Sequence, residues 1–160
     1  MNSPSIQTLT FLFDNKTDHI LLNQIAINGP SKRKHSGIPG EPGFHEDINS
    51  AAIRSIFEAT SLEVQQVILR GVVKTIYEND QECIIYFVYE SGRFKGELKN
   101  NLPGRLKWVD ILNIFNLEIE TVTREIMPNL LDGESFFEGT LILDKEYQIV
   151  SSDIRICNSI

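Results

Sequence analysis

Hydrophobic and polar positions near the N-terminus predict a β-hairpin followed by a long loop. Residues Ile6 to Phe13 are rich in Thr, Leu and Phe, which is typical of a strand. A polar turn from Asp14 to Asp18 separates this strand from the expected return strand, His19 to Gln24. The segment from Asn28 to Gly43 carries four Gly and three Pro, so we expect a loop. Loops of this length in compact domains are more often functional than idle.

Helical spacing is clear in the next segment, which predicts a helix within Asp47 to Ser61. Asp47 is a suitable N-cap residue. Ile48, Ala52, Ile56 and Ala59 then recur at helical intervals, which predicts one buried face.

The rest of the chain alternates between β-rich and helical segments. Strands are expected within Val64 to Tyr77, Glu82 to Tyr89, Leu106 to Val109, Phe136 to Leu143 and Tyr147 to Ile156. The polar residues 78–80 predict a second hairpin, and residues 144–146 a third. Helices are expected within Asp110 to Phe115 and Glu118 to Leu131, where Pro128 predicts a kink or an early end. This order predicts an α/β (α+β) sandwich in which helices cover a mixed sheet. We expect one domain over residues 1–160, with a C-terminal β-hairpin extension at 136–156.

Composition and charge narrow the classes of partner. Hydrophobic residues make up 41% and charged residues 23%, as in ordinary globular proteins. The net charge of −7 argues against a nucleic acid polymer, whose binding depends on Lys and Arg contacts to phosphates. A small phosphorylated ligand, such as a nucleotide, remains compatible, because one local basic or metal-charged cleft is enough.

Neither a membrane span nor a secreted disulfide framework is expected. The longest apolar run, Ile84 to Tyr89, is far shorter than the roughly 20 residues of a membrane helix. Met1 to Phe13 has no basic residue, unlike a signal peptide. Cys83 and Cys157 are far apart and form no CxxC motif. We therefore expect a cytoplasmic, reducing location.

One stretch carries chemistry. From Gly40 to Leu62 the chain reads GEPGFHEDINSAAIRSIFEATSL. It resembles the Nudix box of the Nudix hydrolase family (MutT-like): Gly, five residues, Glu, seven residues, then Arg-Glu-apolar-any-Glu-Glu-any-Gly-apolar. The positions in register are Gly40, Glu46, Arg54, Ile56, Glu58 and Leu62. Three positions depart: Ser55 replaces a Glu, Ala59 replaces the second Glu of the pair, and Ser61 replaces Gly.

The surrounding order of elements is also similar to that family. A hairpin precedes the box, long strands follow it, and Gly104 to Trp108 looks like the family's Gly-any-Leu-any-Trp strand. The resemblance covers about Ile6 to Leu131, and the last hairpin resembles some bacterial members more loosely. It implies a Nudix-type α/β/α sandwich and a pyrophosphohydrolase (pyrophosphatase) activity on a nucleoside diphosphate derivative.

The departures from the box predict an impaired metal centre. The resemblance implies a helix face of carboxylates that holds Mg²⁺ or Mn²⁺ against a substrate diphosphate. Residues 55, 58 and 59 share that face, and only Glu58 keeps a carboxylate. The family often adds a Glu where this chain has Pro103; Glu82 and Glu97 are candidate substitutes. We therefore expect weak or absent metal binding, with Glu58 and Glu46 as the remaining candidate ligands, and weak or lost catalysis.

Further site candidates have both a functional and an ordinary interpretation. The resemblance implies that Arg54 pairs with Glu46 and organises the box; the alternative is an exposed ion pair worth about 0–1 kcal/mol. Glu58 is a site-facing ligand or a solvated helix residue. Lys32 and Arg33, with Gly40, are candidate substrate-binding residues, although the basic cluster fits a solvated loop equally.

Aromatic residues are expected in the core rather than at a nucleobase. Phe87, Tyr89 and Trp108 lie in predicted strands, and Phe44, beside the box Glu, is predicted to be a packing anchor. Three functions therefore remain open: a weakened hydrolase, a non-catalytic module that binds a nucleotide or related phosphometabolite, and a homodimeric interaction protein that uses a sheet edge or the last hairpin.

Overall fold

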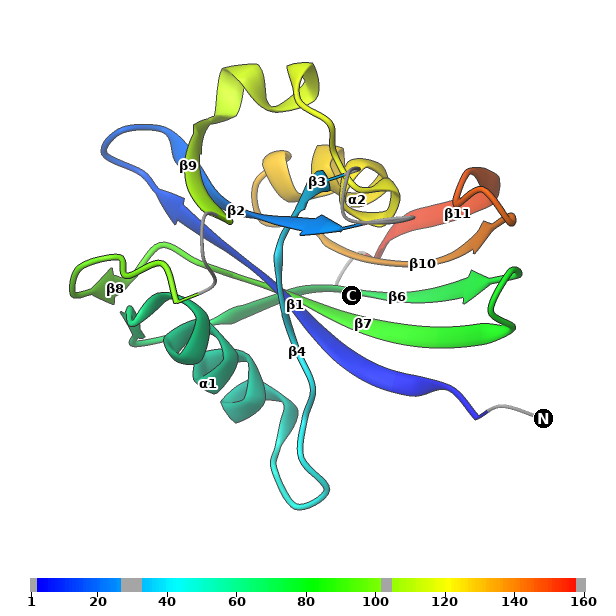
Figure 1. Cartoon of the computed structure of the whole chain (residues 1–160), viewed down its shortest axis with the longest axis horizontal. Helices are drawn as coiled ribbons and strands as arrows, with labels where there is room; N and C mark the ends of the chain where they lie inside the picture. Colours follow the sequence, from blue (N-terminus) through cyan, green and yellow to red (C-terminus); the bar gives the residue numbers. More distant parts are fainter. Residues whose placement is uncertain (1–2, 27–32, 102–104, 158–160) are drawn as a thin grey trace.

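The computed structural model describes residues 3–26, 33–101 and 105–157, and its centre is one large mixed sheet (Figure 1). The main strand order is β11-β10-β6-β7-β1-β2-β3, with β4 paired to β1 and β9 paired to β2. The strands of this sheet are β1 Ser5–Asp14, β2 His19–Ala26, β3 Arg33–Ser36, β4 Ile38–Gly40, β6 Ile68–Tyr77, β7 Glu82–Ser91, β9 Leu106–Asp110, β10 Phe136–Leu143 and β11 Ile149–Cys157. The remaining elements are α1 Ile48–Thr60, the short pair β5 Glu63–Val64 and β8 Phe94–Lys95, the 3₁₀ helix η1 Ile111–Asn116, and α2 Thr121–Leu131.

The sheet combines three hairpins with two parallel contacts. The antiparallel pairs β1–β2, β6–β7 and β10–β11 match the three predicted hairpins. Strand β1 pairs in parallel with β7, and β10 pairs in parallel with β6. Parallel neighbours require long crossover connections, which here contain the helices. The predicted α/β (α+β) sandwich is confirmed.

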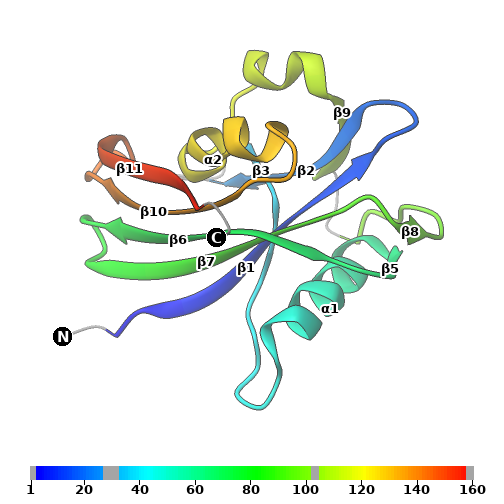
Figure 2. The same ribbon diagram turned by 180° about the vertical axis from the view of Figure 1, so that it is seen from behind.

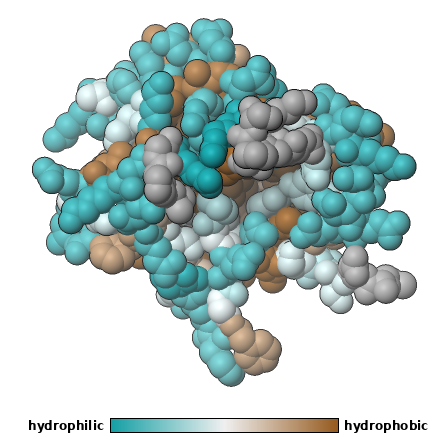
Figure 3. Space-filling view, viewed as in Figure 1, coloured by the Kyte–Doolittle hydropathy of each residue, from teal (hydrophilic) through white to brown (hydrophobic). Residues whose placement is uncertain are grey.

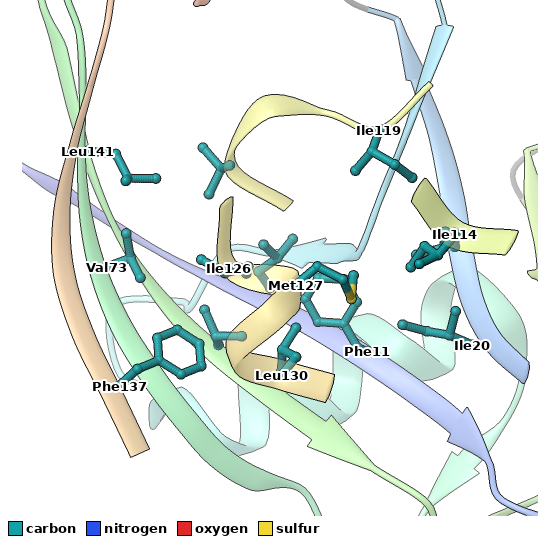
Figure 4. Close-up of a cluster of buried hydrophobic side chains, with 14 of the residues drawn as sticks. Phe11, Ile20, Val73, Ile114, Ile119, Ile126, Met127, Leu130, Phe137 and Leu141 are labelled. Atoms are coloured by element: carbon teal, nitrogen blue, oxygen red, sulfur yellow. The ribbon is translucent and has the colours of Figure 1, made fainter. Parts of the chain in front are cut away.

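Helices α1 and α2 cover opposite faces of the sheet (Figures 1 and 2). Successive side chains of a strand point to opposite faces of the sheet, so adjacent residues of β1 pack under different helices. Phe11 packs in the core under α2, together with Ile126 and Met127, as Figure 4 shows. Leu12 packs in the second core, under α1, together with Ile56. Each face of the central strands is therefore buried.

The C-terminal hairpin joins the sheet through β10. Phe137 of β10 lies opposite Gly71 of β6, and a Cβ at Gly71 would overlap the Phe137 ring. Glycine at position 71 thus lets the buried Phe137 ring pack closely against the neighbouring strand. The hairpin predicted at 136–156 forms, and β11 is the outer strand.

The loop expected from Asn28 to Gly43 is wrong over residues 33–36 and 38–40. Residues 33–36 form β3 beside β2, and residues 38–40 form β4 beside β1. Pairing with distant strands overrides the local Gly and Pro content, and Pro39 is tolerated because β4 is a short strand beside the main ladder. Residues 28–32 lie outside the described part of the chain.

Two helical predictions also change in detail. The segment after β9 is a 3₁₀ helix, and α2 continues through Pro128 to Leu131 instead of ending early. Within the described residues, no helix is long and apolar enough to cross a membrane.

Candidate functional site

Helix α1 begins and ends as its sequence predicts. The Asp47 carboxylate accepts a hydrogen bond from the Ser50 N–H at 2.7 Å and so satisfies an N-terminal donor of the helix. Ser61 follows the helix in a left-handed conformation, with φ of 63°. Glycine adopts this conformation without strain, which explains the glycine in the Nudix pattern. Here Asn101 donates hydrogen bonds to Ser61 Oγ and to the Glu58 carbonyl at 3.1 and 2.9 Å.

Arg54 is the centre of the box. Its Nε and Nη2 donate to the two oxygens of Glu46 at 2.8 and 3.0 Å, which makes a bidentate pair. Nη1 donates to Glu58 Oε2 at 3.0 Å, and Nη2 also donates to the Glu41 carbonyl at 2.9 Å. The Gly43 N–H donates to Glu46 Oε1 at 3.0 Å. One guanidinium thus ties the loop before α1 to the helix, and we call these five residues the arginine clamp.

The arginine clamp changes the acidity of Glu46. Hydrogen bonds from the Arg54 guanidinium and, second, from the Gly43 N–H lower the pKa of the Glu46 carboxyl to about 2. In turn, the hydrogen bonds that Arg54 donates to Glu46 and Glu58 raise the pKa of Arg54 above its usual range. Glu46 is therefore ionised throughout the neutral range, and the predicted Arg54–Glu46 pair is present.

Gly40 and Ser55 lie in close contact beneath this loop. A Cβ at Gly40 would overlap the Ser55 side chain and the Thr8 hydroxyl. Ser55 is only 7% exposed, although the Nudix pattern has a Glu there. The Cβ of residue 55 is therefore tightly packed against β4. Ser55 also lines the cleft that lies between β4 and α1.

A cleft of about 640 Å³ opens between β4 and α1. Its lining residues are Gln7, Pro39, Gly40, Glu41, Arg54, Ser55, Glu58 and Ala59. The side-chain carboxylates among them belong to Glu41 and Glu58, and the Glu58 side chain is 62% exposed. Ser55 offers a hydroxyl, and Ala59 offers no ligand atom.

The donor set of this cleft does not fit a metal centre built from several carboxylates. Among the described residues, no group of three or more His, Cys, Asp or Glu side chains could hold a metal ion. Glu58 already accepts a hydrogen bond from Arg54, and both Glu46 oxygens bind the same guanidinium. Mg²⁺ needs about six oxygen ligands, so most would have to come from water and substrate.

The structure brings together only some of the predicted site residues. Gly40, Arg54 and Glu58 line the cleft, whereas Glu46 lies behind them in the arginine clamp. Arg33 lies on β3 and does not line the cleft. Lys32 lies outside the described residues.

The proposed replacement carboxylates are not in the cleft either. Neither Glu82 nor Glu97 lines it, and Pro103 and Gly104 lie outside the described residues. The helix face at positions 55, 58 and 59 is therefore not supplemented by either of these two carboxylates.

A second pocket, of about 300 Å³, adjoins the cleft, because Gln7 and Pro39 line both. The residues that line this pocket besides these two are Leu9, Ile25, Lys34, Ser36, Tyr77, Tyr86, Glu120, Thr121, Glu146 and Tyr147. The hydroxyls of Tyr77 and Tyr86 are 2.9 Å apart and hydrogen-bonded. Burial raises the pKa of Tyr86 to about 12 and that of Tyr77 further above its usual range, so both hydroxyls stay protonated at neutral pH. We call this space the tyrosine pocket.

Glu120 is the buried acid of the tyrosine pocket and the N-cap of α2. Its carboxylate accepts hydrogen bonds from the Val122 and Thr123 N–H groups at 2.8 and 2.9 Å. Burial raises its pKa, and these helix donors oppose the rise. The sequence does not single out Glu120, because Glu is an uncommon N-cap residue and position 120 lies inside the helix predicted from Glu118 to Leu131.

His35 lies within the segment that the sequence predicts to be a loop, Asn28 to Gly43. In the structure it is 7% exposed and lies on β3. Its N–H donates to the Glu118 carbonyl at 2.7 Å, and the Glu120 N–H donates to the His35 carbonyl at 2.9 Å. These bonds fix the segment that carries Glu120 into the tyrosine pocket.

The prediction that Phe44 is a packing anchor is wrong. Phe44 is 97% exposed on the loop from β4 to α1, which projects from the body of the molecule (Figure 3). The arginine clamp fixes this loop through polar contacts, so no apolar anchor is needed. Tyr89, Phe87 and Trp108 do pack in or against the core under α1, as predicted.

Comparisons with known proteins agree with this geometry. No family model matches the chain. Among curated proteins it is similar to the uncharacterized Nudix hydrolase YvcI of Bacillus subtilis (strain 168), with 22% identity over 110 residues, which cover 66% of this chain and 70% of that protein.

Solved structures share the fold. The MutT protein of Bacillus halodurans matches with a TM-score of 0.81 and 19% identity over 94% of this chain and 97% of its own. The Nudix domain of Shewanella oneidensis NrtR, complexed with ADP ribose, matches with a TM-score of 0.68 and 12% identity over 82% of this chain and 89% of its own. The fold is that of the Nudix hydrolases, and the comparisons support this family, as the resemblance of the box predicted.

Proposed function

We propose that the chain binds a nucleoside diphosphate derivative in the box cleft and the tyrosine pocket, with weak or lost pyrophosphohydrolase activity. The observation that carries this proposal is the state of the box carboxylates. Glu46 and Glu58 are bound to Arg54, while positions 55 and 59 hold Ser and Ala. The loop-helix frame of a hydrolase is kept, and the charges that would hold metal ions are mostly missing.

The distribution of charged groups in the cleft supports slow hydrolysis rather than hydrolysis at an ordinary enzymatic rate. Cleavage of a diphosphate develops negative charge that metal ions and basic groups must stabilise. In this cleft the retained guanidinium already faces carboxylates on two sides. Mg²⁺ or Mn²⁺ would depend on Glu58 and on substrate oxygens, so we expect low affinity for the metal.

The adjoining pockets support a two-part ligand. The cleft with Gly40 and Arg54 is the proposed place for the diphosphate, and the tyrosine pocket for the group attached to it. Tyrosine rings offer flat apolar surface, and Lys34, Ser36 and Glu120 add polar groups for orientation. ADP-ribose, which the NrtR domain binds, is a suitable probe because it has this two-part form.

A thermal-shift titration with ADP-ribose, run beside a hydrolysis assay with Mg²⁺ or Mn²⁺, tests the proposal. A ligand that binds only the folded state raises the unfolding temperature. We expect stabilisation with little or no release of product. Rapid hydrolysis would contradict the lost-catalysis part, and the absence of stabilisation by ADP-ribose and by a panel of nucleoside diphosphates would contradict the binding part.

A second candidate function is that of a homodimeric interaction protein. The observation that favours it is the outer edge of β11, which no other described strand covers. This function does not compete with ligand binding, since β11 lines neither the cleft nor the tyrosine pocket. We also propose a reducing, cytoplasmic location, in which the free thiols of Cys83 and Cys157 would persist.

A further inference from the structure

Within the part of the chain that the structure describes, strand β11 has one neighbouring strand, so its outer edge is long and free. It contains nine residues, Ile149–Cys157, and pairs on one side with β10 at the end of the sheet order. Two large hydrophobic side chains on it are exposed, Val150 at 58% and Ile156 at 46%. An unpaired strand edge offers a row of N–H and C=O groups to another strand, and proteins usually protect such edges.

Strand β11 lacks most of the features that commonly prevent an exposed strand edge from pairing with another strand. Its nine residues include no Pro and no Lys, which commonly block edge pairing. Its two charged residues, Asp153 and Arg155, have opposite signs, so the strand is neutral in a chain with a net charge of −7. The strand at the other end of the sheet order, β3, has only four residues. Repulsion between two acidic copies is thus smallest where the free edge is longest.

Symmetry limits how two copies of β11 can pair. An antiparallel pair related by a two-fold axis places residues of the same face opposite each other. With Ile154 on the axis, Asp153 of each copy lies opposite Arg155 of the other. With Asp153 on the axis, two aspartates would lie opposite each other, which is unfavourable. Charge complementarity therefore favours the register centred on Ile154.

The existing contacts extend this pattern across the sheet. Arg155 Nε lies 3.1 Å from Glu138 Oε1 on β10, its direct register partner, and Arg155 Nη2 lies 2.7 Å from Asp153 Oδ2 of the same copy. In the Ile154 register the row reads Glu138, Arg155, and then Asp153 of the second copy. Opposite charges alternate along this row. The row lies on the sheet face away from α2, because the neighbours of Glu138 in β10, Phe137 and Gly139, are buried on the other face.

We propose that a second copy of this chain pairs with β11, and that the two strands form an antiparallel ladder centred on Ile154. The two sheets then continue into one another across the dimer. The cleft and the tyrosine pocket stay open in each copy, because β11 lines neither. The proposal is independent of whether the cleft binds or cleaves its ligand.

Light scattering during size-exclusion chromatography tests the assembly. We expect the full chain to elute as a dimer and Asp153→Arg, which places like charges opposite each other, to weaken self-association by about tenfold or more. The matched control, Glu97→Arg, makes the same charge change away from β11 and should leave the dimer intact. A wild-type chain that stays monomeric at high micromolar concentration overturns the proposal.

Disulfide trapping tests the register. In a Cys83→Ala background, Ser151→Cys lies opposite Cys157 of the second copy, at a separation that a disulfide can span. The same two cysteines within one copy are about 20 Å apart, so they cannot bridge. We expect mild oxidation to give a covalent dimer. Ser152→Cys, whose side chain lies on the other face, is the control and should give none. A dimer that Ser151→Cys does not trap overturns this register.

Discussion

Gly40 of β4 lies directly against Ser55 of α1, with no room for a Cβ between them. This contact sets the distance between β4 and the helix that carries Arg54 and Glu58. It connects two box positions: the glycine of the Nudix pattern and the position where this chain has Ser in place of the pattern's Glu.

Gly40→Ala should destabilise the protein by about 1–3 kcal/mol, because the added methyl overlaps Ser55 and Thr8 in a packed site. Urea denaturation measures the change. Gly43→Ala is the matched control: its Cβ would be 3.6 Å from the nearest atom, an ordinary contact, so we expect little loss of stability. Equal losses in the two variants would contradict the close-contact explanation.

Glu46→Gln should remove a pH-dependent part of the stability. The folded-state pKa of Glu46 is lowered from 4.5 to about 2, so its ionisation stabilises the folded state above pH 4.5. That contribution is lost as the pH falls from 4.5 towards 2. We expect wild type to exceed the variant in unfolding free energy at pH 6 and the difference to shrink through this window. A difference that stays constant down to pH 2 would argue against the pairing with Arg54.

Arg70→Ala should cost about 3–5 kcal/mol, because it leaves a partly buried carboxylate without its ion-pair partner. Arg70 is 2% exposed, and its guanidinium lies 3.1 Å from the Glu90 carboxylate. It also donates hydrogen bonds to the carbonyls of Asn129 and Leu130 in the last turn of α2 and of Ser135 just before β10. Arg93→Ala removes an exposed arginine of the same sheet region and should change stability little. Chemical denaturation compares the two, and similar small effects would contradict a structural role for Arg70.

Gln7→Trp should weaken ADP-ribose binding by about tenfold or more, which is roughly 1.4 kcal/mol. Gln7 lines both the cleft and the tyrosine pocket, so a larger side chain there obstructs a ligand that spans them. Gln65→Trp, at an exposed position outside both spaces, serves as the control. Isothermal titration calorimetry reports the affinities. Unchanged binding in Gln7→Trp would place the ligand elsewhere.

Local signals in the sequence were enough to predict the box helix, and the resemblance to the Nudix box implied its main ion pair. Asp47 caps α1, and Arg54 pairs with Glu46 in the arginine clamp. Such features depend on residues within one turn or one loop. The three hairpins were predictable for the same reason, since each joins strands that are close in the chain.

Features made by distant segments were not predictable in this way. Lys34 and Tyr147 come from β3 and the β10–β11 turn, and only the folded sheet brings them to one pocket. The exposure of Phe44 was also missed, because its hydrophobic side chain suggested packing. Polar contacts of Glu46 and Arg54 hold that loop instead, and these leave Phe44 in solvent.

Steady-state hydrolysis of ADP-ribose by Ser55→Glu/Ala59→Glu with Mg²⁺ tests most directly whether missing carboxylates limit this cleft. Ser55→Gln/Ala59→Gln, which adds similar volume without charge, is the matched control. We predict a turnover well above that of wild type in the Glu variant alone. Wild-type turnover at an ordinary enzymatic rate, about 1–10³ s⁻¹, with no gain in the Glu variant, would contradict the account.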